Sequence, residues 1–460
     1  MGRTDPVDDE GTLEVNGWGE DASPDWSQGR RRKALIFLVA CLGVGAAPHW
    51  LGPLRGVVPA LGCALVLGGY SLRTLLASRS PLADLADPDP LDEACPLPSV
   101  DVLVAARDEE SVIERLVQSV SAIDYPDDRV TLWVIDDGSQ DRTGRLLDEL
   151  SEQHPRLQVR HRTRDAGGGK SGALNALLPH LHGDWLMVLD ADASVTPDLL
   201  QRLRPWLAGS DWDGLQLRKA VVHPQASLLT RAQALEMAFD AEIQQGRIAQ
   251  AGVGELRGNG QLLRRAAVRA CGGFNEDTVT DDLDLSIRFL LEGHPVLVLW
   301  DPPVLEEPVT HWSALLRQRQ RWAEGGLQRY FDYWPALVFT APLSRRQRLD
   351  VALFFLIQYV LPVASFGDLL GALGWRQSPL LWPLSLSTLT LSALALIRAG
   401  RRSSEGPALP VPTLPTVLLV NLYLLHWFLV IPWVSLRMAT RPKRLVWAKT
   451  VHAGLPVTTG

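Results

Sequence analysis

Hydrophobic residues form long apolar runs near both ends of the chain and short apolar runs in its middle. Two long runs, 34–51 and about 57–75, precede the middle, and three more follow it at 349–375, 380–397 and 414–436. The first two are each close to the ~20 residues that an α-helix needs to cross the hydrocarbon core of a bilayer. The pattern therefore predicts a polar central domain held between membrane helices from both ends.

Basic residues at 30–33 precede the first run and place the N-terminus in the cytoplasm by the positive-inside tendency. Two crossings then return the chain to the cytoplasm. The run 349–375 contains Gln358 and Asp368, and we expect it to form an interfacial or re-entrant helix, because such side chains are rare in lipid. We expect four spans, which keeps the basic C-terminal tail inside, with five spans as the alternative.

Short apolar runs in the middle alternate with segments of helical spacing. Strands are predicted at 100–106, 131–135, 157–161 and 185–189. Helices are predicted at 109–122 and 171–181, and a further helix follows the second strand and ends at residue 150. Alternating strands and helices at this spacing indicate an α/β, Rossmann-like, mostly parallel sheet with helices on both faces. A nucleotide-binding crevice is expected at the carboxyl ends of its strands.

Two carboxylates, Asp190 and Asp192, end the strand at 185–189. Hard oxygen ligands at a strand end suit Mg²⁺, or Mn²⁺, carrying a substrate diphosphate. A solvated turn is the alternative interpretation, because Asp-x-Asp alone is a weak motif. The neighbouring loops are therefore needed to distinguish a metal site from a solvated turn.

Two further loops should converge on the same crevice. Residues 105–109 follow the first strand, and Asp136-Asp137 follows the second. The carboxylate of Asp137 can accept hydrogen bonds from a base or a ribose, although an acid before a helix is also a common N-cap. Lys170 follows three glycines, and a phosphate contact by this lysine is expected even though Arg164 breaks the P-loop pattern.

Three acids at 281, 282 and 284 follow Thr280 where a helix begins. One acid would favour the helix N-terminus, but three exceed what a cap requires, and we expect a catalytic base among them. Farther on, Gln318-Arg319-Gln320-Arg321-Trp322 has helical spacing that brings Gln318 beside Arg321 and Trp322, as an ordinary amphipathic helix would also do.

Composition excludes several classes. The net charge of −7 comes with no basic face interleaved with aromatic residues, so no nucleic-acid partner is expected, and no protein partner is evident. The four cysteines are scattered without a Cys-x-x-Cys pair, which argues against zinc and disulfides.

A chain of 460 residues is longer than a domain with a single hydrophobic core usually is, so more than one structural unit is expected. The predicted units are an acidic disordered leader (1–29), two membrane helices (30–78), a linker (79–98), the α/β domain (99–340), interfacial and membrane helices (341–436) and a basic cytoplasmic tail (437–460).

Taken in order, the motifs at 136–137, 190–192, 280–282 and 318–322 resemble those of the inverting family 2 glycosyltransferases, which have the GT-A fold. The resemblance covers roughly 98–334. One departure is Thr-Asp-Asp where the family commonly has Thr-Glu-Asp, but the last acid, the expected base, is kept. The segments 254–261, 321–326 and 441–452 resemble the cyanobacterial diacylglycerol glucosyltransferases of that family.

The resemblance implies UDP-glucose as donor, diacylglycerol as acceptor, Mg²⁺ as cofactor with Mn²⁺ possible, and a cyanobacterial plasma or thylakoid membrane as location. It implies that Asp282 is the base and that Gln318 and Trp322 lie on the acceptor side. The donor-binding residues that it implies are Ala105, Arg107, Asp137, Lys170, Asp190 and Arg321, with Asp192 and Asp190 at the metal.

Two rival functions remain open on these residues. Gln-x-x-Arg-Trp is also usual in processive polysaccharide synthases of the cellulose and hyaluronan type, although few spans are available for a polymer channel. A membrane scaffold or receptor that binds a nucleotide sugar without turnover is the second rival, and the intact acids argue against it.

Overall fold

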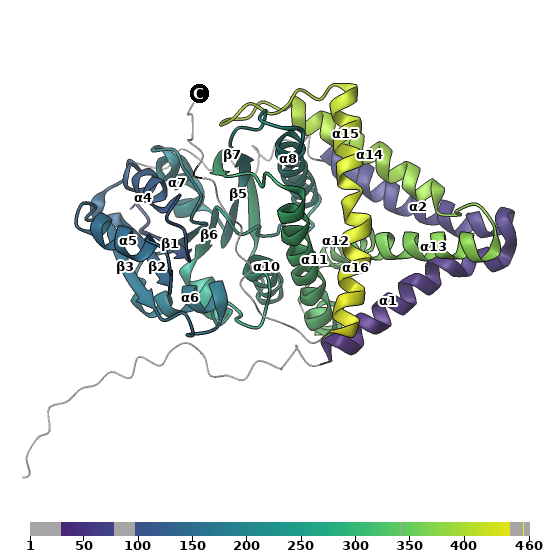
Figure 1. The fold of residues 1–460 in the computed structure, drawn as a ribbon, viewed down its shortest axis with the longest axis horizontal. Helices are drawn as coiled ribbons and strands as arrows, with labels where there is room; N and C mark the ends of the chain where they lie inside the picture. The colour runs from purple at the N-terminus through teal and green to yellow at the C-terminus, as the bar shows by residue number, and fades with distance from the viewer. Residues whose placement is uncertain (1–28, 78–96, 341, 442–453, 455–460) are drawn as a thin grey trace, which may run out of the picture.

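The computed structural model describes residues 29–77, 97–340, 342–441 and Gly454. The predicted leader, most of the linker and most of the basic tail lie outside these residues. The described part consists of an α/β domain and a bundle of helices contributed by both ends of the chain (Figure 1).

A seven-stranded sheet forms the centre of the α/β domain, in the order β3-β2-β1-β4-β6-β5-β7. Only β6 runs antiparallel to its neighbours, β4 and β5, so the predicted mostly parallel sheet is confirmed. The strands are β1 (Val100–Ala106), β2 (Val130–Asp137), β3 (Leu157–Arg162), β4 (Trp185–Leu189), β5 (Gly214–Val221), β6 (Gln261–Arg264) and β7 (Val296–Glu306).

Helices cover both faces of the sheet, as the alternation predicted. One face is covered by α4 (Ile113–Ser121), α5 (Thr143–Ser151) and α7 (Leu199–Gly209). The other is covered by α6 (Gly169–Leu177), α9 (Arg265–Ala270) and α10 (Asp281–Glu292). Apolar side chains alternate along β1, β2 and β4 and fill the hydrophobic cores on the two faces of the sheet. Both faces of each of these strands are therefore buried.

The strand register brings the predicted loops together. Ala106 of β1 pairs with Asp136 of β2, and Val104 pairs with Leu189 of β4. The three strands are parallel, so the loops that follow them leave the same edge of the sheet. All the acidic motifs that follow β1, β2 and β4 therefore face one side of the domain.

Two long helices, α8 (Leu228–Ala249) and α11 (Trp312–Pro335), complete the domain on the side of the bundle. A Cβ on Gly325 of α11 would overlap the side chain of Thr280, the residue before α10, and a Cβ on Gly326 would overlap the Tyr359 hydroxyl. The paired glycines therefore let α11 lie close to the start of α10 on one side and to the bundle on the other.

The bundle contains α1 (Arg30–Ala46), α2 (Gly52–Ala77), α12 (Arg345–Phe355), α13 (Leu361–Trp375), α14 (Trp382–Arg401), α15 (Leu414–Leu424) and α16 (His426–Thr440). In Figure 1, α1, α2, α13 and α14 project away from the α/β domain and converge at a tip. By contrast, α15 and α16 form one long helix that crosses the base of this projection beside α11. Four helical stretches among the described residues are long and apolar enough to cross a membrane: Arg30–Ala77, Arg345–Trp375, Trp382–Arg401 and Leu414–Thr440.

Asp368 of α13 connects the helix pair α1 and α2 to the helix pair α13 and α14 near the tip of the projection. Its carboxylate lies 2.8 Å from Nε2 of His49 and accepts hydrogen bonds from the backbone N–H groups of Leu380 and Leu381. Asp368 is buried and has these partners inside the protein, so its charge is no sign of an interfacial helix. The interfacial position of 349–375 stays a prediction; in the structure α13 packs along α1 within the projection.

Candidate active site

A crevice of about 640 Å³ opens at the edge of the sheet where these loops meet. The ten residues predicted for donor binding, acceptor binding, metal binding and catalysis all line it. They are Ala105, Arg107, Asp137, Lys170, Asp190, Asp192, Asp282, Gln318, Arg321 and Trp322.

The two acids at the end of β2 have different surroundings. Asp136 accepts a hydrogen bond from the backbone N–H of Ser139 and pairs with His161, so it stabilises the turn after the strand. Asp137 instead lies 3.3 Å from guanidinium nitrogens of both Arg107 and Arg162. Burial raises the pKa of Asp137, although both arginines oppose the shift. The structure thus separates the acid that stabilises the turn, Asp136, from the acid that faces the crevice, Asp137.

Lys170 reaches the centre of the crevice from the first turn of α6. Gly167, Gly168 and Gly169 precede it with positive φ angles of 77°, 69° and 56°, a backbone that favours glycine. The ammonium group of Lys170 lies 2.7 Å from Asp190 and 3.9 Å from Asp281. Burial lowers the pKa of Lys170, but these carboxylates outweigh burial and raise it, so the lysine is positively charged.

Other acidic side chains surround the carboxylate of Asp192. One of its carboxylate oxygens accepts the backbone N–H of Glu307 at 2.9 Å. Burial raises the pKa of Asp192 to about 8, and repulsion from Asp190 and Glu306 adds to the shift. A divalent cation at this position would remove the repulsion.

The acids at the end of β4 fit a hard divalent cation. Among the described residues no group of three His, Cys, Asp or Glu side chains surrounds one point, so Asp190 and Asp192 would supply the protein ligands and a diphosphate and water the rest. Oxygen ligands of this kind suit Mg²⁺ or Mn²⁺. Asn259 supports the pair, because its side-chain oxygen accepts the backbone N–H of Asp190 and its amide nitrogen lies 3.3 Å from Glu306.

Asp282 lies in the first turn of α10, beside the backbone of Gly258. Burial and the neighbouring Asp281 raise the pKa of Asp282, which is about 6 after the opposing effects of Lys170 and Lys219. The shift expected for a base near apolar surroundings is therefore present. A carboxylate with this pKa is ionised near neutral pH and still basic enough to take a proton from a hydroxyl group.

Gln318, Arg321 and Trp322 reach the crevice from α11. The Trp322 indole contacts two cations: the guanidinium carbon of Arg319 lies 4.0 Å from the ring centre and the Lys219 ammonium 5.0 Å. Cations at such distances are attracted to the face of an indole ring. The tryptophan is thus held in place on the wall of the crevice.

Sequence reasoning missed Lys219, Glu306 and Arg257, which also line the crevice. Glu306 ends β7, so the signal that found Asp137 and Asp192, an acid directly after a buried strand, was available for it. Lys219 gave no such signal. It sits inside β5, next to a register shift between Leu217 and Lys219, and its direction follows from strand pairing alone.

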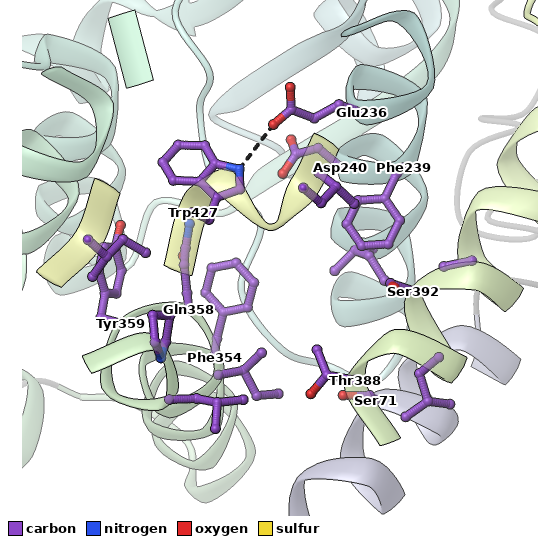
Figure 2. Close-up of a pocket in the computed structure, with 18 of the residues that line it drawn as sticks. Ser71, Glu236, Phe239, Asp240, Phe354, Gln358, Tyr359, Thr388, Ser392 and Trp427 are labelled. Carbon is purple, nitrogen blue, oxygen red and sulfur yellow. Dashed lines mark hydrogen bonds between the residues drawn. The ribbon is translucent and has the colours of Figure 1, made fainter. Parts of the chain in front are cut away.

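A second cavity, of about 370 Å³, lies between the bundle and the α/β domain. Its walls come from α2, α8, α14, α16 and the turn between α12 and α13, and they are largely apolar. Figure 2 shows Phe239, Phe354 and Trp427 among the side chains around it. The two cavities share five wall residues: Lys219, Arg257, Thr280, Asp282 and Trp322. The apolar space therefore opens onto the candidate base.

Residues 98–325 match the family described as glycosyltransferase like family 2. A beta-monoglucosyldiacylglycerol synthase of Synechocystis sp. is 45% identical over 93% of this chain and 89% of its own length. The chain belongs to glycosyltransferase family 2. A protein of the same name from Nostoc sp. is 40% identical over 94% of this chain and 91% of its own length.

The fold of this glycosyltransferase is also found in solved structures. The mannosyltransferase PcManGT of Pyrobaculum calidifontis, solved with GDP-Man and Mn²⁺, has a TM-score of 0.55, 20% identity, and coverage of 82% of this chain and 99% of its own. At this identity the likeness concerns the fold. Together with the sheet order, it confirms the GT-A-like α/β fold predicted for this glycosyltransferase.

Proposed function

We propose that this glycosyltransferase transfers glucose from UDP-glucose to the free hydroxyl of 1,2-diacylglycerol with inversion, giving β-monoglucosyldiacylglycerol. The observation that carries the proposal is the shared wall of the two cavities, where Asp282 faces a polar crevice on one side and an apolar cavity on the other. A water-soluble donor and a lipid acceptor require such a junction. The names of the relatives at 40–45% identity support the same donor sugar and acceptor.

On the donor side, Ala105, Arg107 and Asp137 hold the uridine at the ends of β1 and β2. Lys170 and Arg321 supply positive charge for the diphosphate. Asp190 and Asp192 would hold Mg²⁺, or Mn²⁺, which would offset the negative charge that builds on the departing UDP. The raised pKa of Asp192 supports this use of the two acids.

On the acceptor side, Asp282 takes the proton of the diacylglycerol hydroxyl as the hydroxyl oxygen forms its bond to the anomeric carbon. The bond from that carbon to UDP breaks on the opposite face, and UDP leaves with the electron pair. An α-linked donor therefore gives a β-glucoside, and the proton remains on Asp282. Gln318 and Trp322 border the acceptor, whose acyl chains extend into the apolar cavity.

The test is to incubate detergent-solubilised protein with Mg²⁺, diacylglycerol and separately labelled UDP-glucose, UDP-galactose and UDP-N-acetylglucosamine, and to resolve the lipid products. One β-glucosyl diacylglycerol is the expected product. Labelled polymer that stays at the origin would instead support a polysaccharide synthase. Binding of UDP-glucose without UDP release would support the scaffold interpretation.

A further inference from the structure

The long helix formed by α15 and α16 begins and ends on the same side of the bundle. Before its start, Glu405 pairs with Arg202 of α7 in the α/β domain. At its end, Arg437 pairs with Glu324 of α11, and the backbone oxygen of Ala439 accepts a hydrogen bond from Arg31 at the start of α1. Both ends are therefore attached to the base of the projection and neither to its tip.

The middle of this helix is also attached to the α/β domain. Trp427 donates a hydrogen bond from its indole nitrogen to Glu236 of α8, at 3.1 Å (Figure 2). The Tyr423 hydroxyl donates a second hydrogen bond to Glu236, at 2.6 Å, and the Tyr423 ring lies 5.8 Å from that of Trp312, the first residue of α11. The stretch Leu414–Thr440 contains 27 residues, or ~40 Å of helix, and it contacts α8 through α15 and α11 through α16.

The outward face of the helix carries a continuous apolar stripe. Its members are spaced three or four residues apart, the spacing of one helix face, and their exposed fractions range from 40% to 71%. They are Leu414, Leu418, Leu422, Leu425, Leu429, Trp433 and Leu436. The adjoining face, with Leu424, Trp427 and Phe428, lines the apolar cavity, and Leu425 at the edge of the stripe borders this cavity as well.

Charge distinguishes the two ends of the bundle. The base carries the basic residues of 30–33 and 345–348, together with Arg398, Arg401 and Arg402 at the end of α14. The tip carries Arg55 and Arg376, next to exposed Trp50 and Trp375. Excess basic charge marks the cytoplasmic side, and tryptophans gather where a membrane meets water.

We propose that α1, α2, α13 and α14 cross the membrane and that the helix α15–α16 lies in its cytoplasmic leaflet, with the apolar stripe buried among the lipid acyl chains. The stripe continues the lipid-facing surface of the crossing helices, and the basic residues of the base lie at the level of anionic headgroups. The number of spans stays at the four expected from the sequence, but α13 replaces the run 414–436 among them. The chain after residue 441 then remains in the cytoplasm, and Gly454, whose added Cβ would lie 2.8 Å from the backbone oxygen of Ser111, is next to the α/β domain.

Cysteine labelling tests the topology. Single cysteines are placed at Val411→Cys, Arg441→Cys and Trp50→Cys in a full-length background whose four native cysteines are serine, and they are exposed to a membrane-impermeant maleimide. We expect Val411→Cys and Arg441→Cys to react only in inverted vesicles, and Trp50→Cys only in right-side-out vesicles. Labelling of 411 and 441 from opposite sides, or of all three from one side, would overturn the proposal.

Spin-label depth tests the orientation of the helix. Labels at Leu418→Cys, Leu422→Cys, Leu429→Cys and Leu436→Cys should report one common depth from their relative exposure to oxygen and to a water-soluble nickel complex in a lipid nanodisc. Matched labels on the crossing helix α2, at Leu54→Cys, Leu65→Cys and Leu76→Cys, should report shallow, deep and shallow positions. A label depth that changes steadily from 418 to 436 would contradict the proposal that the helix lies in the plane of the membrane.

Oxygen that cannot reach the labels on the stripe would mean that a second copy of the chain covers it, which also contradicts the proposal. Neither measurement involves sugar transfer. A wrong donor or acceptor under the proposed function would therefore leave both results unchanged.

Discussion

The guanidinium group of Arg319 stacks on the indole of Trp322, with its carbon 4.0 Å from the ring centre. Both residues lie in the same turn of α11, but only Trp322 lines the two cavities. Arg319 is fully buried and pairs with Glu236 of α8. Arg319 and Glu236 both contact Tyr423 of α15, so this cluster links the wall of the crevice to the bundle.

We expect Arg319→Met to lower the stability of the enzyme by about 3–5 kcal/mol, because it leaves the buried carboxylate of Glu236 without its charge partner. The double variant Glu236→Leu/Arg319→Met removes both charges and should recover most of this loss, yet KM for the acceptor should stay raised because Trp322 has lost its support. Thermal unfolding and acceptor titration measure the two effects. An acceptor KM that returns to the wild-type value in the double variant would show that Arg319 has no part in holding Trp322.

Asp282→Asn should reduce transfer by about 10²–10⁴-fold, because the amide cannot accept the proton of the acceptor hydroxyl. Binding of UDP-glucose, followed by calorimetry, should remain close to wild type, since the donor contacts come from other residues. Asp198→Asn, at an exposed acid directly before α7 and outside the crevice, is the control. Turnover near the wild-type rate in Asp282→Asn would remove this residue from the mechanism.

The pH profile should follow the ionisation of Asp282. The pKa of Asp282 is raised to about 6 and the reaction requires the ionised form, so the rate should fall as the pH drops through about 6. Asp281→Asn removes a charge that raises this pKa and should move the acid limb to lower pH. Lys219→Met removes a charge that lowers it and should move the limb to higher pH, whereas Lys219→Arg should leave it in place. Shifts of both variants in the same direction would contradict the assignment.

Asp192→Ala should abolish the part of donor binding that depends on the metal, because it removes one of the two carboxylates at the end of β4. UDP titration with and without Mn²⁺ measures this part, and electron paramagnetic resonance of Mn²⁺ reports metal binding without turnover. Treatment of the wild type with EDTA should produce the same loss. The assignment of Asp192 would be wrong if Mn²⁺ still tightened UDP binding in the variant as strongly as in the wild type.

Gly325→Ala should disturb the base through Thr280. The new methyl group would overlap the Thr280 side chain directly before α10, at a cost of about 1–3 kcal/mol, and relieving the overlap moves the helix start that carries Asp282. Gly374→Ala is the control, because a Cβ there meets no atom within 4 Å. We expect a lower kcat and a lower unfolding temperature for Gly325→Ala alone.

Much of the site could be predicted because it depends on short-range features. The acids that end β2 and β4 stand directly after buried strands, and parallel pairing brings such positions to one edge wherever the strands fall in the sheet. The three strands on the other side of the sheet were not predicted. There β6 runs antiparallel between β4 and β5, an order that no spacing along the chain indicates.

Long-range partners account for what the sequence could not reveal. Lys219 and Arg218 are neighbours in β5, but Arg218 hydrogen bonds to the backbone of Trp300 while Lys219 faces the crevice. Arg319 has its partners Glu236 and Tyr423 83 and 104 residues away, so its burial could not be read from the motif around it. The apolar run 414–436 is long enough to span a bilayer, and the partners of its flanking residues, Arg202, Glu324 and Arg31, are far away in the sequence.

The junction of the two cavities has a kinetic consequence. Asp282 lies on a wall common to the polar crevice and to the apolar cavity beside the bundle, so under the proposed function donor and acceptor arrive from different phases. The relevant acceptor concentration is then its mole fraction in the bilayer and not its amount per volume of solution. Adding inert lipid at constant total diacylglycerol should slow the enzyme by surface dilution, whereas adding buffer should change only its saturation with UDP-glucose.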